Sequence, residues 1–512
     1  MLVKTYGSAI QGIDALVITV EVNIGKGRKF YLVGLPDNAV KESQQRMIAA
    51  LGNIGYRFPG QRIVINMAPA DIKKEGSAYD LPIGIGILAA SKQINAGLLD
   101  QYIMMGELSL DGGLKPIKGA LPIALKAREQ GFRGIILPIQ NISEAAVVSG
   151  LEVYGFEHIT DVIQMLDGKT KPIPASADLG QMIESEMNHY AFDFEDVKGQ
   201  ENIKRALEIA AAGGHNAIMI GPPGSGKTML AKRLPSILPP MSLNEALETT
   251  KIHSVAGILN GKTGLVTTRP YRSPHHTISD AGLVGGGPYP QPGEISLAQN
   301  GVLFLDELPE FKRSVLEVMR QPMEDRVVTI SRARVTVTYP ASFMLIAAMN
   351  PCPCGYYNDP NRECVCSPGA VKSYLNKISG PLMDRIDLHV EVTPVPFKDL
   401  AETPKGEVSA SIRARVMAAK KIQETRFATT PDIFSNAQMS SKDVDKYCIL
   451  QADGFSLLKT AMERLSLSAR AFVRIKKVAR TIADLDNSAD IKAEHLAEAI
   501  QFRSLDRESW GS

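Results

Sequence analysis

A glycine-rich loop that contains one lysine and one threonine is the clearest chemical feature of the sequence. Its residues are Gly221, Pro222, Pro223, Gly224, Ser225, Gly226, Lys227 and Thr228, and they follow the short apolar run Ala217–Ile220. Their spacing matches the pattern G-x-x-x-x-G-K-[ST], which joins a buried strand to a helix and holds phosphates. Backbone N–H groups surround the phosphates, the lysine reaches the β- and γ-oxygens, and the threonine hydroxyl ligates Mg²⁺. The loop therefore predicts a site for ATP with Mg²⁺, and a plain glycine-rich turn is the alternative.

Two further apolar runs end in polar side chains that suit hydrolysis. Residues 301–305 lead into Asp306 and Glu307, and residues 344–349 lead into Asn350. We expect Asp306 to hold the Mg²⁺ shell and Glu307 to polarise the attacking water as a general base. The neutral Asn350 side chain can hold that water without competing for the metal. A solvated strand end and an asparagine that only forms a turn are the alternatives.

The composition is that of an ordinary globular protein. The chain has 512 residues, of which 44% are apolar and 22% charged. We therefore expect about three domains and exclude a single small module or a disordered tail. A formal net charge of +2 and a pI near 8.1 mean that any nucleic-acid contact must be local. The first residues lack the layout of a signal peptide, and the longest apolar runs, such as Leu81–Ala90, are about half a membrane span. We expect a cytoplasmic protein without membrane contact.

Strand-like and helix-like segments alternate through residues 1–166. Strands are predicted at Leu16–Ile24, Lys29–Val33, Arg62–Asn66, Tyr102–Leu110 and Gly134–Leu137, and helices from about Asp37, near Leu81, around Ala120–Gln130 and near Thr160–Leu166. Residues 167–190 lose this periodicity and gain proline, serine and charge, which predicts a linker.

The rest of the chain shows two different patterns of predicted secondary structure. Residues 191–395 alternate strands with helices, a pattern that predicts a parallel sheet with crossover helices. Residues 396–512 show helical spacing, with helices predicted at Val408–Arg426, Ser440–Cys448, Gly454–Arg464, Ser468–Leu485 and Ile491–Phe502. The predicted fold class is α/β, with an N-terminal α/β domain, a parallel-sheet core and a C-terminal helical lid.

Together these motifs resemble those of an AAA+ ATPase. Four further segments closely resemble the magnesium-chelatase-like ComM/YifB family within that superfamily: RPYRSPHHT (269–277), GGGPYPQPGEISLAQNGVLFLDELPEF (285–311), SGPLMDRIDL (379–388) and VARTIADL (478–485). The resemblance runs almost end to end. It implies a ring, usually a hexamer, whose nucleotide sites lie between neighbouring subunits.

The resemblance also gives roles to two arginines. Arg385 matches the position of the arginine finger, and Arg470 matches the lid arginine known as sensor 2. A guanidinium presented by a neighbour stabilises charge on the γ-phosphate and makes hydrolysis depend on assembly. The alternatives are a surface pair of Arg385 with Asp384 or Asp387, and a solvated helix face for Arg470.

Two strand-like runs, Val327–Ser331 and Val335–Tyr339, flank Arg332-Ala333-Arg334. This hairpin resembles the pre-sensor-1 hairpin of the minichromosome maintenance helicases, with Arg332 at the basic tip. A ring of such tips would follow the phosphate backbone without reading sequence, so we expect Arg332 and Arg334 to contact DNA. A merely exposed, soluble hairpin is the alternative.

The RPYRSPHHT segment looks like the helix-2 insertion of this clade. Adjacent side chains do not share a helix face, so we expect its His275 and His276 to serve a structural or phosphate-contacting loop rather than a metal.

Four cysteines lie in one short stretch: Cys352, Cys354, Cys364 and Cys366. Two CxC pairs separated by a loop provide enough thiolates for a closed, structural Zn²⁺ site, which would stiffen the segment after Asn350. Free thiols that pack the loop are the alternative. The fifth cysteine, Cys448, has the pattern of a small core residue.

The N-terminal domain resembles the Lon-protease-like domain that the family carries. Peptidase chemistry of this type needs a serine nucleophile and a lysine base. The resemblance places Ala78 and Leu121 at those positions, although Ser77 and Lys118 stand next to or near them. We therefore expect a protease fold without protease activity.

These observations predict an Mg²⁺-dependent ATPase that assembles as a homo-hexamer on single-stranded and branched DNA. The family resemblance implies helicase or branch-migration activity on recombination intermediates, in some bacteria during natural transformation. The alternative is a magnesium-chelatase-like ATPase that remodels a protein partner.

Overall fold

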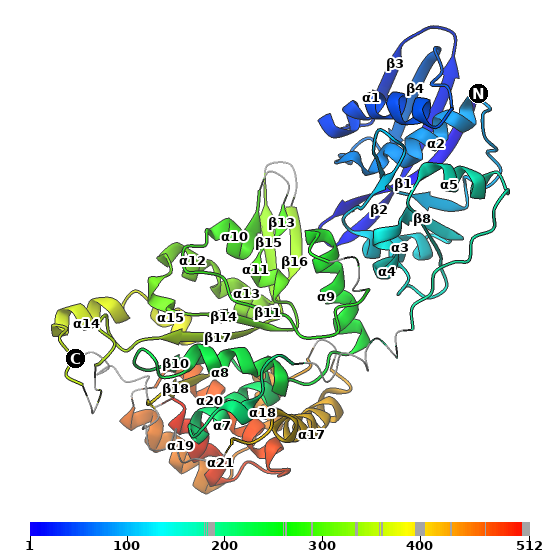
Figure 1. Cartoon of the computed structure of the whole chain (residues 1–512). Helices are drawn as coiled ribbons and strands as arrows, with labels where there is room; N and C mark the ends of the chain where they lie inside the picture. The colour runs from blue at the N-terminus through cyan, green and yellow to red at the C-terminus, as the bar shows by residue number, and fades with distance from the viewer. Residues whose placement is uncertain are drawn as a thin grey trace. The chain divides into compact units, whose positions relative to one another are not determined.

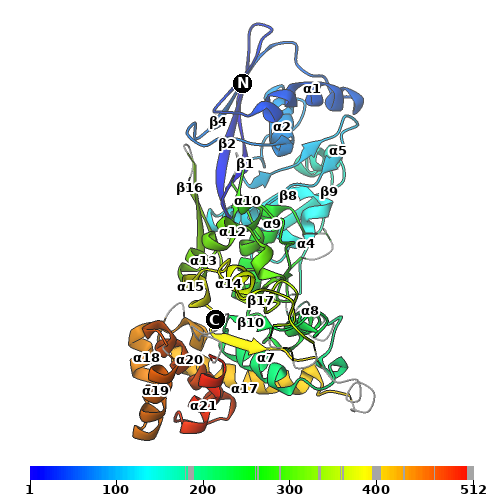
Figure 2. The same cartoon turned by 90° about the vertical axis from the view of Figure 1, so that its left-hand side faces the viewer.

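The computed structural model describes the chain except for residues 179, 181, 183–189, 260, 262–263, 288–289, 333–335, 358, 360–361, 395–404, 431–432, 466 and 504–512 (Figures 1 and 2). The chain forms two compact units. Unit 1 comprises Met1–Met187, Ser242–Thr267 and Ser331–Tyr339, and unit 2 comprises Asn188–Met241, Thr268–Ile330 and Pro340–Ser512.

Unit 1 is built on a seven-stranded mixed sheet in the order β3-β4-β2-β1-β5-β8-β9. Strands β1 and β2 form an antiparallel hairpin, β4 pairs antiparallel with β2, and the other neighbours are parallel. The strands are β1 (Leu2–Gln11), β2 (Asp14–Gly25), β3 (Phe30–Val33), β4 (Arg62–Ala68), β5 (Tyr102–Met104), β8 (Gly134–Pro138) and β9 (Glu152–Phe156). A second, two-stranded sheet pairs β6 (Glu107–Leu108) with β7 (Leu114–Lys115).

The helices of unit 1 are α1 (Asn38–Asn53), α2 (Asp80–Ala90), α3 (Ala120–Glu129), α4 (Ile142–Ala145), α5 (Ile159–Leu166) and α9 (Leu243–Ala256). Helix α2 is buried along its whole length and packs on β1 and β2. An apolar helix of this kind belongs inside a core, so α2 is the centre of the unit.

Most predicted elements of this unit are confirmed, but the strands β1, β7 and β9 and the helices α4 and α9 were not predicted. In β1 the polar Thr5 and Ser8 occupy buried positions and hide the apolar alternation. Their hydroxyls are satisfied, because Thr5 Oγ1 donates to the carbonyl of Pro82 at 2.9 Å and Ser8 Oγ donates to that of Leu16 at 2.9 Å. The predicted strand Tyr102–Leu110 is two short strands, β5 and β6.

Helix α9 follows the phosphate loop in the sequence yet packs on α3 in unit 1. Ser254 Oγ in α9 donates to Glu144 Oε2 at 2.6 Å, and the Gly119 N–H donates to the Ser254 carbonyl at 3.1 Å. Burial raises the pKa of the Glu144 carboxyl. Unit 1 thus takes residues from three separate stretches of the chain.

Unit 2 contains a five-stranded parallel sheet in the order β11-β14-β17-β10-β18, which confirms the predicted parallel α/β core. Its strands are β10 (Ala217–Ile220), β11 (Tyr271–Arg272), β14 (Val302–Leu305), β17 (Met344–Met349) and β18 (Leu388–Glu391). The accompanying helices are α7 (Glu201–Gly213), α8 (Lys227–Arg233), α10 (Asp280–Val284), α11 (Glu294–Leu297), α12 (Arg313–Val318), α13 (Arg320–Asp325), α14 (Pro368–Leu375) and α15 (Gly380–Met383). Every residue of β10, β14 and β17 is buried, as a sheet covered on both faces requires.

The C-terminal part of unit 2 is helical, as predicted. It comprises α17 (Ser409–Phe427), α18 (Ser441–Tyr447), α19 (Ala452–Arg464), α20 (Ala469–Leu485) and α21 (Ala493–Gln501). The buried carboxylate of Asp484 accepts hydrogen bonds from Arg426 Nη2 at 2.5 Å and Asn436 Nδ2 at 2.8 Å. Cys448 is buried, as expected. Across the described residues, no helix combines the length and apolarity needed to cross a bilayer.

Candidate nucleotide-binding site

Three neighbouring strands bring the predicted residues to one edge of the unit 2 sheet. Strand β17 lies between β10 and β14, and all three run parallel. Their carboxyl ends therefore lead into the phosphate loop, Asn350 and Asp306 at the same edge, where ligands bind in open parallel sheets. The Gly221 N–H donates to the Met349 carbonyl at 3.2 Å and ties the start of the loop to β17.

Lys227 lies at the centre of this edge. Its buried Nζ donates to the carbonyl of Gly221 at 2.7 Å, to that of Pro222 at 2.9 Å and to Asn350 Oδ1 at 3.2 Å. Burial lowers the pKa of Lys227, and the nearby Asp306 carboxylate opposes that shift. An ammonium group surrounded by oxygen acceptors can exchange them for phosphate oxygens, so the geometry fits the predicted role.

The two predicted Mg²⁺ ligands are in direct contact. Thr228 Oγ1 donates to Asp306 Oδ2 at 2.6 Å. Mg²⁺ prefers a few hard oxygen ligands from the protein and keeps water or phosphate in its other positions. A hydroxyl and a carboxylate side by side match that requirement. Gly226, the residue before α8, has φ of 91°, which a residue with a side chain rarely adopts.

Glu307 follows Asp306 with an unusual backbone conformation, φ 53° and ψ 47°. Its side chain is 58% exposed, and its Oε2 lies 3.2 Å from His276 Nδ1. The sequence pattern did not reveal this contact. It singled out His275 and His276 as a pair but could not place them beside the candidate base, because His276 lies 31 positions before Glu307 in the chain.

The four clustered cysteines come together as predicted. The Sγ of Cys352 lies 3.3 Å from that of Cys354 and 3.7 Å from that of Cys364, and the ligand atoms of all four cysteines lie within 4.8 Å of one another. The N–H of Cys354 points to Cys366 Sγ at 3.4 Å. Four thiols at this spacing, with backbone donors directed at sulfur, fit a tetrahedral Zn²⁺ site. Among the described residues, no other group of three or more histidine, cysteine, aspartate or glutamate side chains could hold a metal ion.

The cysteine loop packs directly on the phosphate loop. Gly355 has φ of 87°, and a Cβ there would lie 2.4 Å from Cδ of Pro223. The same segment begins at Asn350, whose side chain accepts from Lys227. Residues 350–355 therefore touch the phosphate loop at two points, a contact that sequence spacing could not show.

Neither predicted arginine contacts the phosphate loop within the described structure. Arg385 is nearly buried, with 7% of its side chain exposed; its Nη2 pairs with Glu324 Oε1 at 2.5 Å and its Nη1 donates to the Pro381 carbonyl at 2.5 Å. Neither Asp384 nor Asp387 is its ion-pair partner: Arg470 lies 3.5 Å from Asp384, and Arg474 pairs with Asp387.

The predicted basic hairpin is present as β15 (Val327–Ser331) paired with β16 (Thr336–Pro340). Ser331 and Thr336 hydroxyls lie 3.1 Å apart at the base of its tip. Arg332 is exposed, and Arg334 lies outside the described residues.

In unit 1, Ser77 does not meet an amine. Its hydroxyl donates to the carboxylate of Glu107. The aliphatic chain of Lys118 lies beside Gly257. Ala78 and Leu121 carry no group that could react as nucleophile or base, so the predicted absence of peptidase activity stays a prediction with these contacts in its favour.

Known proteins align with nearly the whole chain. The family described as magnesium chelatase, subunit ChlI, matches residues 193–400; the family described as subunit ChlI of Mg-chelatase matches residues 20–141; and the ChlI C-terminal family matches residues 406–503. Competence protein ComM of Haemophilus influenzae is 44% identical over 99% of this chain and 98% of its own length. Protein YifB of Escherichia coli is 44% identical over 98% of this chain and 96% of its own length. Lon protease 2 of Bacillus subtilis is 32% identical over 61% of this chain and 49% of its own length.

The contact between Gly355 and Pro223 leads to a prediction. We expect Gly355→Ala to weaken binding of a fluorescent ATP analogue by about tenfold, which corresponds to about 1.4 kcal/mol, because the new Cβ pushes on the phosphate loop. Gly131→Ala is the matched control, since Gly131 also has a positive φ but open space around its Cα. Equal affinities for the two variants would show that the cysteine loop does not support the phosphate loop.

Proposed function

The chain belongs to the magnesium-chelatase-like ComM/YifB family of AAA+ ATPases, and we propose that it hydrolyses ATP to move along DNA as a hexameric ring. The observation that carries the ATPase part is the shared edge of three parallel strands, where Lys227, the Thr228–Asp306 pair and Asn350 lie in contact.

Each residue at this edge has a role that its chemistry supports. Lys227 binds phosphate oxygens, Thr228 and Asp306 hold Mg²⁺, and Asn350 orients water next to the lysine. When bound, Mg²⁺ neutralises charge on the phosphates. Glu307 accepts a proton from the attacking water and must turn away from His276 to do so.

The proposed ring explains the roles of Arg385 and Arg470. An arginine finger has to leave its own subunit and reach the neighbour's phosphate. Arg385 is held by Glu324, so in our proposal ring assembly replaces this carboxylate by the γ-phosphate. Arg470 acts as sensor 2; in the isolated chain its guanidinium lies 3.5 Å from the carboxylate of Asp384.

DNA is the proposed track because of the β15–β16 hairpin and its arginines, Arg332 and Arg334. The Haemophilus influenzae relative is a competence protein, which supports a role for this chain in the processing of incoming DNA. We propose helicase or branch-migration activity on single-stranded and branched DNA. Residues 1–166 would form a Lon-like domain without protease activity, 167–190 a linker, 191–395 the ATPase core and 396–512 the lid.

The DNA proposal predicts how hydrolysis responds to nucleic acid. Steady-state ATP hydrolysis should rise with single-stranded or four-way branched DNA at fixed salt, and Arg332→Ala should lose that rise because the hairpin no longer neutralises phosphate. Arg464→Ala, an exposed arginine in α19, is the control. Hydrolysis that ignores DNA, together with no salt-sensitive DNA binding, would favour the remodelling of a protein partner instead.

The finger proposal predicts complementation between subunits. Arg385→Ala should lower hydrolysis by a factor on the order of a thousand while ATP binding persists. Rings that mix Arg385→Ala with Lys227→Ala subunits should regain hydrolysis, because one subunit supplies the arginine and its neighbour the intact phosphate loop. Wild-type turnover in an assembled Arg385→Ala ring would remove Arg385 as the finger.

We also propose that Cys352, Cys354, Cys364 and Cys366 hold a structural Zn²⁺. Four thiolates leave no open coordination position, so the ion would stabilise the loop and take no part in hydrolysis.

Metal analysis tests this site. Gently purified protein should contain about one equivalent of zinc, and Cys364→Ser should lose it and melt at a lower temperature. Cys448→Ser should keep the zinc, because Cys448 is buried in the helical part, away from the cluster. A zinc content below about a tenth of an equivalent in the wild type would exclude the site.

A further inference from the structure

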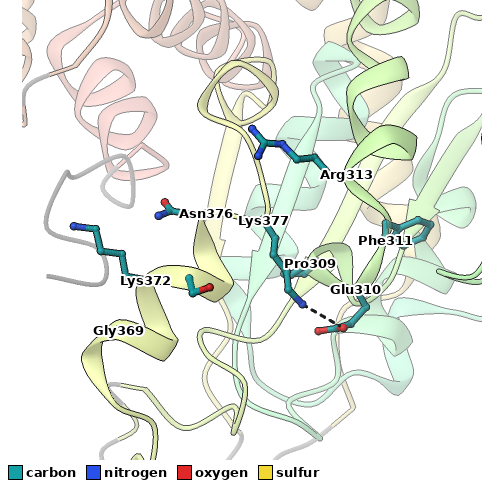
Figure 3. A pocket seen from close by; sticks show the side chains of 9 residues that line it. Pro309, Glu310, Phe311, Arg313, Gly369, Lys372, Asn376 and Lys377 are labelled. Atoms are coloured by element: carbon teal, nitrogen blue, oxygen red, sulfur yellow. Dashed lines mark ion pairs between the residues drawn. The ribbon is translucent and has the colours of Figure 1, made fainter.

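A pocket of about 630 Å³ opens beside the catalytic edge of unit 2. One wall is the short turn η5 (Leu308–Glu310) with the start of α12, and the other wall is α14 and the residues that follow it (Figure 3). Glu310 and Arg313 lie on the first wall, and Lys372, Asn376 and Lys377 lie on the second. The pocket is therefore concave and lined from both sides by polar side chains.

Positive charge dominates this pocket. Lys377 Nζ lies 3.5 Å from Glu310 Oε2, so one cation is neutralised. Lys372 forms no ion pair with any residue that the structure describes. In α12, Glu317 lies one helical turn from Arg313 but pairs with Arg320 at 2.8 Å. Arg313 and Lys372 are exposed and available to a ligand. A concave surface with two exposed cations that form no close ion pair among the described residues attracts anions.

The lining indicates which anion fits. Phosphate needs several N–H donors, and Arg313, Lys372 and the Asn376 amide supply them. A nucleobase needs an exposed aromatic face, and the aromatic ring of this pocket, Phe311, is buried. We propose that the pocket binds the phosphate backbone of a nucleic acid strand, without reading its bases.

The walls of the pocket are joined to the catalytic residues. The Glu310 N–H donates to the Glu307 carbonyl at 2.8 Å, and the Phe311 and His276 rings meet in a T-shaped arrangement, with 6.4 Å between centroids. His276 in turn contacts the Glu307 carboxylate. A phosphate bound to Lys377 would displace the Glu310 carboxylate from it. Because Glu310 is hydrogen-bonded to Glu307, this displacement would shift the turn that follows the candidate base. Strand binding at this pocket is thereby coupled to ATP hydrolysis.

This inference rests on the proposed DNA motor and extends it to a second contact with the strand. The test uses full-length protein and a fluorescein-labelled oligothymidylate, whose binding is followed by anisotropy between about 50 and 200 mM salt. The double variant Arg313→Ala/Lys372→Ala should reduce the slope of log affinity against log salt by about 1.4, since each lost phosphate contact on a single strand contributes about 0.7. Arg464→Ala/Lys459→Ala removes the same charge from exposed positions of α19 and should keep the wild-type slope.

The conservative variant Arg313→Lys/Lys372→Arg keeps both charges and should retain the wild-type slope, which separates charge from misfolding. An unchanged slope in the double alanine variant overturns the pocket while leaving the motor intact. An unchanged slope with loss of the hexamer, measured by light scattering, assigns the cations to a neighbouring subunit and also overturns it. A wild-type protein that binds no DNA refutes the proposed DNA motor itself.

Discussion

The parallel register of β14, β17 and β10 is the constraint on which the rest of unit 2 depends. Parallel strands end at the same edge, so three polar segments that are far apart in the sequence meet there without any further device. The hydrogen bond from Gly221 to Met349 and that from Lys227 to Asn350 then lock the phosphate loop to the neighbouring strand. The Thr228–Asp306 pair follows from the same alignment.

Two loops outside the sheet support this edge. The cysteine loop meets Pro223 through Gly355, where only a residue without a side chain fits. The loop before α10 supplies His276 to Glu307. Gly355 meets the phosphate loop through packing, and His276 meets the candidate base Glu307 through one polar contact, so a change in either loop reaches the site directly.

The two candidate arginines, unlike the cysteine loop, do not contact the phosphate loop of their own chain within the described structure. Arg385 and Arg470 lie away from their own phosphate loop, and Arg385 is paired with Glu324 in a nearly buried position. A buried cation needs a partner, and Glu324 provides it within the isolated chain. In the ring that we propose, exchange of this carboxylate for a phosphate would make an isolated subunit inactive and an assembled one active.

Local patterns in the sequence determined the phosphate loop, the carboxylate pair, Asn350, the cysteine cluster, the hairpin and the C-terminal helices, because each consists of residues that are adjacent or in one element. Strand β1 escaped detection, since its buried hydroxyls interrupt the apolar alternation. The contacts of His276 with Glu307, of Gly355 with Pro223 and of Arg385 with Glu324 were decided by the tertiary structure alone. So were the placement of α9 in unit 1 and the basic pocket between η5 and α14. In each of these cases the partners come from different elements, and nothing in their own stretches of sequence specifies which side chain will lie opposite.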